Sequence, residues 1–185
     1  MEMYLIAIII MLVISMVVQW SFRKRFSRYA EIQLSSGLSG KEVAEKMLSD
    51  YGIFDVNIMS TEGQLSDHYN PTNKTVNLST DVYHGRSIAA AAVAAHECGH
   101  AVQHALGYSP LKLRSALVPV VNFASNIVQW VLLAGVLLMH VFPGLLWFGI
   151  ILFAMTTLFS FITLPVEINA STRAVGWLTQ TGITD

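Results

Sequence analysis

Three long apolar runs alternate with more polar segments along the chain. The first covers residues 3–20, the second residues 116–141 and the third residues 145–164. Each run is about as long as an α-helix must be to cross the hydrocarbon core of a bilayer. Pro143 and Gly144 lie between the second and third runs, where they favour a tight turn. The pattern therefore predicts one membrane anchor helix and one transmembrane helical hairpin.

The segment between the first two runs begins with a helical pattern. In residues 39–52 ("SGKEVAEKMLSDYG"), polar residues surround Val43, Ala44 and Met47, which fall on one face at helical spacing. Gly52 is a typical residue at a helix C-terminus. We therefore expect an amphipathic helix here.

Residues 56–79 then show short alternating stretches that predict strands. A turn is expected at residues 70–73, followed by a strand in which Val76 and Leu78 point to one side. We expect a small antiparallel sheet packed near the helix described next. A strand at residues 74–79 could bind an extended peptide by strand addition, and a purely structural sheet is the alternative.

An alanine-rich run at residues 89–108 carries two histidines and a glutamate. Residues four apart share one face of a helix, so His96 and His100 project together, with Glu97 beside them. This is the H-E-x-x-H spacing, in which two imidazoles bind one zinc ion (Zn²⁺) and the glutamate acts as a general base. The spacing predicts a zinc site with Glu97 as the catalytic residue.

The surroundings of this motif strengthen the interpretation, because the short pattern also occurs by chance in unrelated proteins. Ser87 can cap the start of the helix and Gly107 can end it, so the motif lies in the middle of the helix. Three ionisable groups among alanines and valines require a partner, and a metal ion supplies one.

Composition indicates where this helix is located in the cell. Hydrophobic residues make up 54% of the chain and charged residues 12%, which is too apolar for an ordinary soluble domain. The net charge of -1 gives no indication of a nucleic-acid partner. Cys98 is the single cysteine, so no disulfide framework is expected, and it is interpreted as a small buried helix residue rather than a ligand. The composition therefore predicts a membrane protein.

Basic residues indicate how the chain crosses the membrane. Arg23, Lys24, Arg25 and Arg28 directly follow the first apolar run, which is typical of an uncleaved anchor. All eleven Lys and Arg residues lie between the first and second runs or after the third. By the positive-inside rule, the N-terminus lies outside and the His96 helix lies in the cytoplasm of a multi-pass protein of the bacterial inner-membrane type.

A catalytic zinc site requires a third protein ligand besides the two histidines. His104 follows His100 by one helical turn. Histidines on three successive turns cannot all point at a single ion, so a supporting or surface role is favoured for His104. After the motif helix, Glu167 is the single carboxylate before the terminal Asp185. Two membrane crossings return Glu167 to the same membrane face. The alternative is that Glu167 begins an interfacial helix after Pro165.

Three linked motifs carry a resemblance to a known family. They are "DHYNPTNKTVNLSTDVYHGRS" at residues 67–87, "AVAAHECGHAVQ" at 92–103 and "TLPVEINAS" at 163–171. Together they resemble the YugP-like family of membrane-anchored neutral zinc metallopeptidases, over nearly the whole chain. The resemblance implies a gluzincin-type site similar to that of HtpX-like membrane proteases. In such a site His96, His100 and Glu167 bind zinc and Glu97 is the acid and base.

This sequence departs from those families at two places. HtpX-like sites usually carry an aspartate four residues after the ligand glutamate, where this chain has Ser171, so Asn169 is a candidate to orient the ligand instead. Members of the YugP-like family also tend to continue into a further hydrophobic helix, so we expect this chain to be shortened after "TQTGITD". A second oxyanion donor is not identified by the sequence, and the available side chains are His68, Tyr69, Tyr83 and Arg173.

The predicted fold is a mainly α membrane protein with three transmembrane helices and a small α+β, zincin-like cytoplasmic domain. We expect an anchor at residues 1–22, a metallopeptidase domain at 23–115 and the hairpin at 116–164. A C-terminal helix at residues 165–185 would carry the third zinc ligand. The expected partners are the lipid bilayer and a peptide or membrane-protein substrate.

Two other functions compete with a zinc-dependent endopeptidase. One is a non-catalytic membrane adaptor with a structural zinc, which an intact Glu97 disfavours because a structural site does not need a general base. The other is an intramembrane protease of the site-2 type, with the motif helix in lipid. Asp81 and Arg86, close to that helix, disfavour it.

Overall fold

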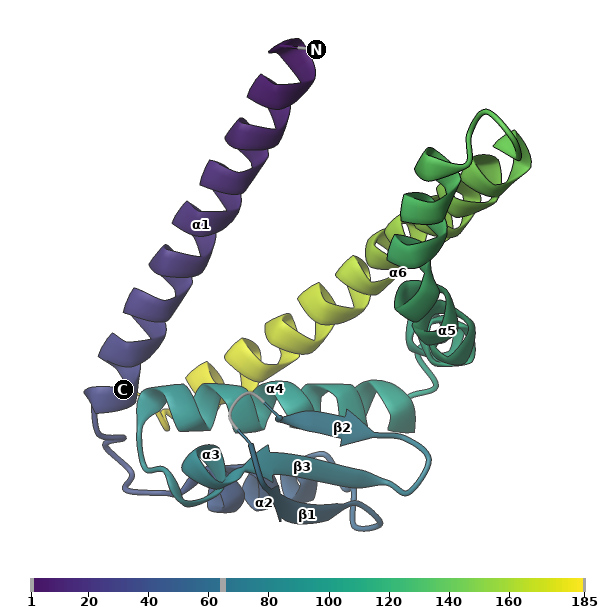
Figure 1. Cartoon of the computed structure of the whole chain (residues 1–185). Coiled ribbons are helices and arrows are strands. Elements are labelled where there is room, and N and C mark those ends of the chain that lie inside the picture. Colours follow the sequence, from purple (N-terminus) through teal and green to yellow (C-terminus); the bar gives the residue numbers. More distant parts are fainter. Residues whose placement is uncertain (1, 64–65, 185) are drawn as a thin grey trace. The chain divides into compact units, whose positions relative to one another are not determined.

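The computed structural model describes residues 2–63 and 66–184, most of which are helical (Figure 1). The chain forms two compact units. The first unit contains the chain up to Cys98 together with the segment from Ala174 onward, and the second unit contains Gly99–Arg173. The boundary falls within one helix, α4 (Ile88–Ala105), so this helix belongs to both units.

The three apolar runs form long helices. They are α1 (Glu2–Glu31), α5 (Ser109–Leu137) and α6 (Pro143–Thr181). Among the described residues, these three helices are long and apolar enough to cross a membrane, and α4 is not one of them. The prediction of three helices of membrane-spanning length is therefore confirmed.

The first unit contains a three-stranded sheet in the order β1-β3-β2. Its strands are β1 (Asn57–Thr61), β2 (His68–Asn70) and β3 (Thr75–Ser79). β2 pairs antiparallel with β3, whereas β1 pairs parallel with it. The predicted antiparallel sheet is therefore wrong, and the sheet is mixed. The alternation of polar and apolar residues marks a strand, but it carries no information about the direction of the partner strand.

The strand at residues 75–79 lies in the middle of this sheet. Its residues pair with β1 on one side and with β2 on the other, for example Asn77 with both Met59 and His68. The predicted peptide-binding strand at residues 74–79 is therefore wrong, because the main chain of β3 is already paired on both edges through most of its length. Val76 and Leu78 are fully buried, in agreement with the predicted core face. Within the described residues, β2 is an edge strand of the sheet.

Two short helices cover part of the sheet. α2 (Gly40–Asp50) and α3 (Thr80–His84) pack against β1, and α3 also contacts β3. α2 begins with a capping box in which the Glu42 carboxylate accepts hydrogen bonds from the backbone N–H and hydroxyl of Ser39. These bonds hold the pKa of Glu42 below its ordinary value. Gly52, with φ +68°, follows the end of the predicted amphipathic helix.

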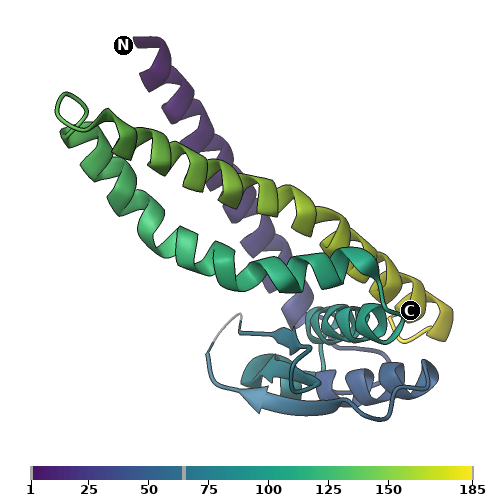
Figure 2. The same ribbon diagram turned by 90° about the vertical axis from the view of Figure 1, so that its right-hand side faces the viewer.

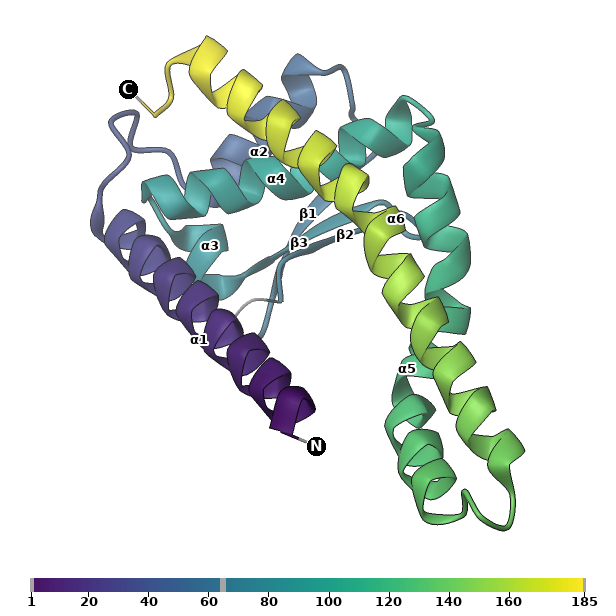
Figure 3. The ribbon, with the colours of Figure 1, turned by 90° about the horizontal axis from the view of Figure 1, so that it is seen from above.

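Backbone hydrogen bonds join the end of α1 to the start of α4. The N–H of Ile88 donates to the carbonyl of Ile32 (3.0 Å), and the N–H of Leu34 donates to the carbonyl of Arg86 (2.8 Å). Ser87 caps α4 as predicted, because its Oγ accepts a hydrogen bond from the N–H of Ala90 at 3.2 Å. These bonds fix the two helix ends side by side within the first unit (Figures 1 and 3).

In the second unit, α5 and α6 form a helical hairpin (Figures 2 and 3). A Cβ on Gly135 would lie 2.7 Å from Cα of Leu146, so glycine allows the two backbones to approach closely near the turn. α6 runs without a break through Pro165. A helix start after Pro165 is therefore wrong, since an apolar helix with a packed neighbour tolerates the loss of one backbone hydrogen bond.

Candidate metal centre

Both histidines of the H-E-x-x-H motif lie on α4, in its central turns. His96 precedes the unit boundary and His100 follows it, but one continuous helix carries both residues, so the helix fixes their spacing. Glu97 and His100 are only 9% and 6% exposed. Buried ionisable groups of this kind need polar partners, because an unpaired charge in an apolar interior is strongly unfavourable.

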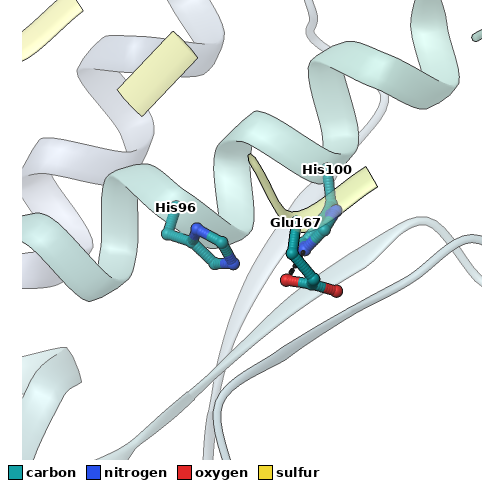
Figure 4. A group of neighbouring side chains, drawn as sticks. All are labelled: His96, His100 and Glu167. Carbon is teal, nitrogen blue, oxygen red and sulfur yellow. Dashed lines mark ion pairs between the residues drawn. The ribbon is translucent and has the colours of Figure 1, made fainter. Parts of the chain in front are cut away.

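Glu167 of α6 lies beside His100 within the second unit. The distance from His100 Nε2 to Glu167 Oε2 is 3.4 Å. Each of His96, His100 and Glu167 offers one ligand atom, and these atoms all lie within 4.8 Å of one another (Figure 4). The structure therefore brings together the three side chains that the sequence predicts as zinc ligands.

A glycine allows α6 to approach the motif helix closely enough for this arrangement. A Cβ on Gly99 would lie 2.7 Å from the backbone oxygen of Ala170. The contact atom belongs to the main chain and cannot move independently of α6. Any side chain at position 99 would therefore separate the two helices and draw Glu167 away from His100.

Gln103 makes Nδ1 of His100 a hydrogen-bond donor. Its Nε2 donates hydrogen bonds to the carbonyl of Val166 (2.8 Å) and to Oδ1 of Asn169 (3.0 Å). The other atom of the amide, Oε1, lies 3.0 Å from His100 Nδ1. An amide oxygen can only accept a hydrogen bond. His100 Nδ1 is therefore the donor, and His100 Nε2 is turned to Glu167.

This arrangement fits a bound metal ion. As a zinc ligand the His100 ring would keep its proton on Nδ1 and offer the lone pair of Nε2, and the cation would be shared with the carboxylate of Glu167. In a tetrahedral zinc site with ligand bonds of about 2.0–2.2 Å, neighbouring ligand atoms are about 3.4 Å apart. The observed separation of 3.4 Å between His100 Nε2 and Glu167 Oε2 has this value. Two imidazoles and a carboxylate are also a typical donor set for zinc.

Two residues of this site are not predicted by the sequence. Gln103, which is fully buried, connects His100 to α6 through the hydrogen bonds described above. Arg114 lies near the start of α5, and its guanidinium is 3.4 Å from Oε1 of Glu167. A glutamine three residues after a motif histidine, on the same helix face, is a signal that could identify Gln103. No local pattern connects Arg114 to Glu167.

The other candidates from the sequence have different surroundings. Asn169 Oδ1 accepts hydrogen bonds from Gln103 and from Arg173 Nε (2.8 Å), so it acts on His100 through Gln103. His104 is not a member of the three-residue group found among the described side chains.

Cys98 is fully buried, and its Sγ lies 3.7 Å from the carbonyl of Ala44. Burial raises the pKa of the Cys98 thiol, which favours the structural role predicted for it.

Two of the side chains considered as oxyanion donors make contacts elsewhere in the first unit. His68 Nε2 lies 3.3 Å from the side-chain amide of Asn77. The ring of Tyr83 packs edge-on against His84 and lies below the ammonium group of Lys41. These contacts give His68 and Tyr83 structural roles in the folded domain.

Three features are typical of a membrane metallopeptidase. They are the H-E-x-x-H helix, the neighbouring glutamate and the three apolar helices. Residues 4–185 match the family described as "Putative neutral zinc metallopeptidase", so the chain belongs to this family. It is also similar to the "Putative membrane protease YugP" of Bacillus subtilis (strain 168), with 46% identity over 156 residues. The match covers 84% of this chain and 68% of that relative. No solved structure matches the chain.

These comparisons support the general class of activity. The family name supports a zinc-dependent peptidase, and the relative's name together with the three apolar helices supports association with a membrane.

Proposed function

We propose that this chain is a membrane-embedded zinc-dependent endopeptidase of the gluzincin type, similar to HtpX-like membrane proteases. His96, His100 and Glu167 would hold the zinc ion, and Glu97 is the general base. The substrate is a peptide or a membrane protein that reaches the site at the membrane surface.

One observation carries this proposal. The Gln103 amide makes His100 Nδ1 a donor, and the opposite nitrogen of the same ring lies 3.4 Å from a carboxylate oxygen of Glu167. In the neutral ring Nε2 carries a lone pair, and a bound cation would be shared by this nitrogen and the Glu167 carboxylate. Glu97, which is the next residue after His96 on the same helix, then has the position of a general base beside the metal.

The chain's own residues supply the proton transfers of peptide hydrolysis. When bound, zinc acts as a Lewis acid that makes water more acidic and polarises a peptide carbonyl. Glu97 takes a proton from the attacking water as the new C–O bond forms. It gives that proton to the nitrogen as the C–N bond breaks, so one residue serves as base and then as acid. Arg114 and Gln103 hold Glu167 and His100 in position during these steps.

Metal removal tests this proposal. The protein purified in detergent should contain close to a full equivalent of zinc by elemental analysis and should cleave an unfolded membrane-protein substrate. A chelator should abolish cleavage, and added zinc should restore it, because two imidazoles and one carboxylate form the predicted ligand set. Cleavage that is unchanged after complete zinc removal would contradict a zinc-dependent mechanism.

We further propose that the chain is a multi-pass protein of the cell membrane, with its N-terminus outside and its active site in the cytoplasm. Support comes from the basic residues in the last turns of α1, directly after its apolar run, and from their absence in the turn between α5 and α6. The lipid bilayer is therefore one partner of the protein.

Cysteine labelling in intact cells tests this orientation. A Gly144→Cys variant should react with a thiol reagent that cannot cross the membrane, whereas an Asn73→Cys variant should react only after the membrane is permeabilised. Gly144 has open space around its Cα, and Asn73 is exposed, so both variants should fold. The native thiol of Cys98 is buried and contributes little background. Labelling of Asn73→Cys in intact cells would show that the orientation is reversed.

A further inference from the structure

A cavity of about 740 Å³ lies in the first unit and reaches the motif helix. This size is within the range of roughly 300–1,000 Å³ that is usual for ligand sites. His96 and Glu97 form part of its lining, together with Asp67. Anything that occupies the cavity therefore lies against the residues to which we assign the chemistry.

The membrane anchor helix provides one wall of this cavity. Four residues from the last turns of α1 line it: Phe22, Arg25, Phe26 and Tyr29. The rings of Phe22 and Phe26 stack with a centroid distance of 6.0 Å, and Phe22 remains 58% exposed. The backbone bonds between the end of α1 and the start of α4 hold this wall in place within the first unit (Figure 3).

Small side chains on α4 keep the opposite wall open. Ala89, Ala92, Val93 and His96 follow one another at helical spacing and line the same cavity. Ala92 is exposed although it lies within an apolar helix. A larger side chain at position 92 would project into the space that the alanine leaves, because Ala92 lines the cavity.

We propose that this cavity binds a large apolar side chain of the peptide substrate, next to the bond that is cleaved. α1 would then determine specificity as well as anchor the protein. This inference rests on the proposed function, because it takes His96 and Glu97 as the residues that face the scissile bond. The aromatic and aliphatic walls favour residues such as phenylalanine or leucine over small or charged ones.

The charged part of the lining favours a peptide over a lipid chain. Asp67 and Glu97 are the acidic residues of the lining and Arg25 is a basic one, and Asp67 already accepts a hydrogen bond from the N–H of Ser79 at 2.7 Å. A peptide carries N–H donors that can reach such acceptors, as well as apolar side chains for the walls. A hydrocarbon chain has no donor and would remove water from both carboxylates without replacing its hydrogen bonds.

Two matched peptides test this specificity. Both are internally quenched and have the same alanine-rich sequence, but one carries a single phenylalanine where the other has alanine. The parent protein should cleave the phenylalanine peptide with a kcat/KM at least about tenfold higher, since filling an apolar pocket typically changes selectivity by roughly 10- to 200-fold. Equal cleavage of the two peptides would overturn the proposal.

Variants of the cavity walls connect this preference to the cavity. Ala92→Leu should lower kcat/KM for the phenylalanine peptide about tenfold more than for the alanine peptide, because leucine occupies the space that the phenylalanine ring needs. Phe22→Ala removes part of the opposite wall and should also weaken the preference. Ala105→Leu is the matched control, because Ala105 is exposed on the same helix and does not line the cavity. An unchanged preference in both wall variants would contradict the assignment.

A binding measurement separates this inference from the proposed function. The Glu97→Gln variant should bind the phenylalanine peptide, labelled with a fluorophore, more tightly than the alanine peptide. Adding Ala92→Leu should remove the difference in fluorescence anisotropy. If the parent cleaves neither peptide but this binding difference is present, the protease function fails and the cavity assignment stands. If instead Ala92→Leu reduces the phospholipid that copurifies and leaves peptide binding unchanged, the occupant is a lipid and the inference is wrong.

Discussion

Replacing Glu97 by glutamine should reduce peptide hydrolysis by roughly 10²-fold or more, while the zinc content stays at a full equivalent. Glutamine preserves the size of the side chain and leaves both histidines in place, but it cannot take a proton from water. A structural zinc site has no such requirement, so this variant separates a protease from a non-catalytic adaptor with bound zinc.

The measurement compares cleavage rates and zinc content of the parent and Glu97→Gln proteins in the same detergent. Glu45→Gln provides a control, because Glu45 forms an exposed i,i+4 ion pair with Lys41 on α2. This control should keep both its zinc and its rate, since surface ion pairs contribute little to stability. If Glu97→Gln cleaves as fast as the parent, Glu97 is not the base.

Replacing Glu167 by alanine should remove both zinc and activity. The change deletes a proposed ligand and leaves Arg114 without the carboxylate that offsets its charge. Loss of a supporting partner alone typically lowers metal affinity by about 10- to 100-fold, so loss of the ligand should lower it at least as much. The loss should be largest at low zinc concentration, because two imidazoles form an incomplete site.

Zinc titration of Glu167→Ala, with unfolding followed on the same samples, distinguishes loss of the ligand from loss of the fold. Glu45→Ala is the matched control for removal of a carboxylate from a helix surface. If Glu167→Ala retains a full equivalent of zinc at low concentration, the third ligand lies elsewhere. His104 would then be the next residue to replace.

Features encoded by neighbouring residues could be predicted from the sequence. The start of α4 at Ser87 and its end near Gly107 follow local capping rules, and the structure has a Ser87 cap and a φ of +66° at Gly107. The three membrane-length helices follow from the length of the apolar runs. The proximity of Glu167 to His100 could be anticipated because few carboxylates remain after the motif helix.

Features that depend on distant parts of the chain could not be predicted in this way. The position of β3 between two strands depends on how β1 reaches it, and alternation within a strand is the same for either direction. Gln103 and Arg114 acquire their contacts only when α6 packs beside them. A proline is a strong local signal for a helix boundary, yet Pro165 lies within α6, because tertiary packing overrides that signal.

The distribution of the proposed ligands along the chain has a consequence for biosynthesis. Both histidines lie on α4, whereas Glu167 lies on α6, beyond the whole of α5. A ribosome therefore completes the two histidines long before it adds the glutamate, and the close approach at Gly99 requires α6 as well. A nascent chain paused before α6 would hold an incomplete centre, and under the proposed function it could not hydrolyse peptide bonds. Activity would begin only after translation had passed the last ligand.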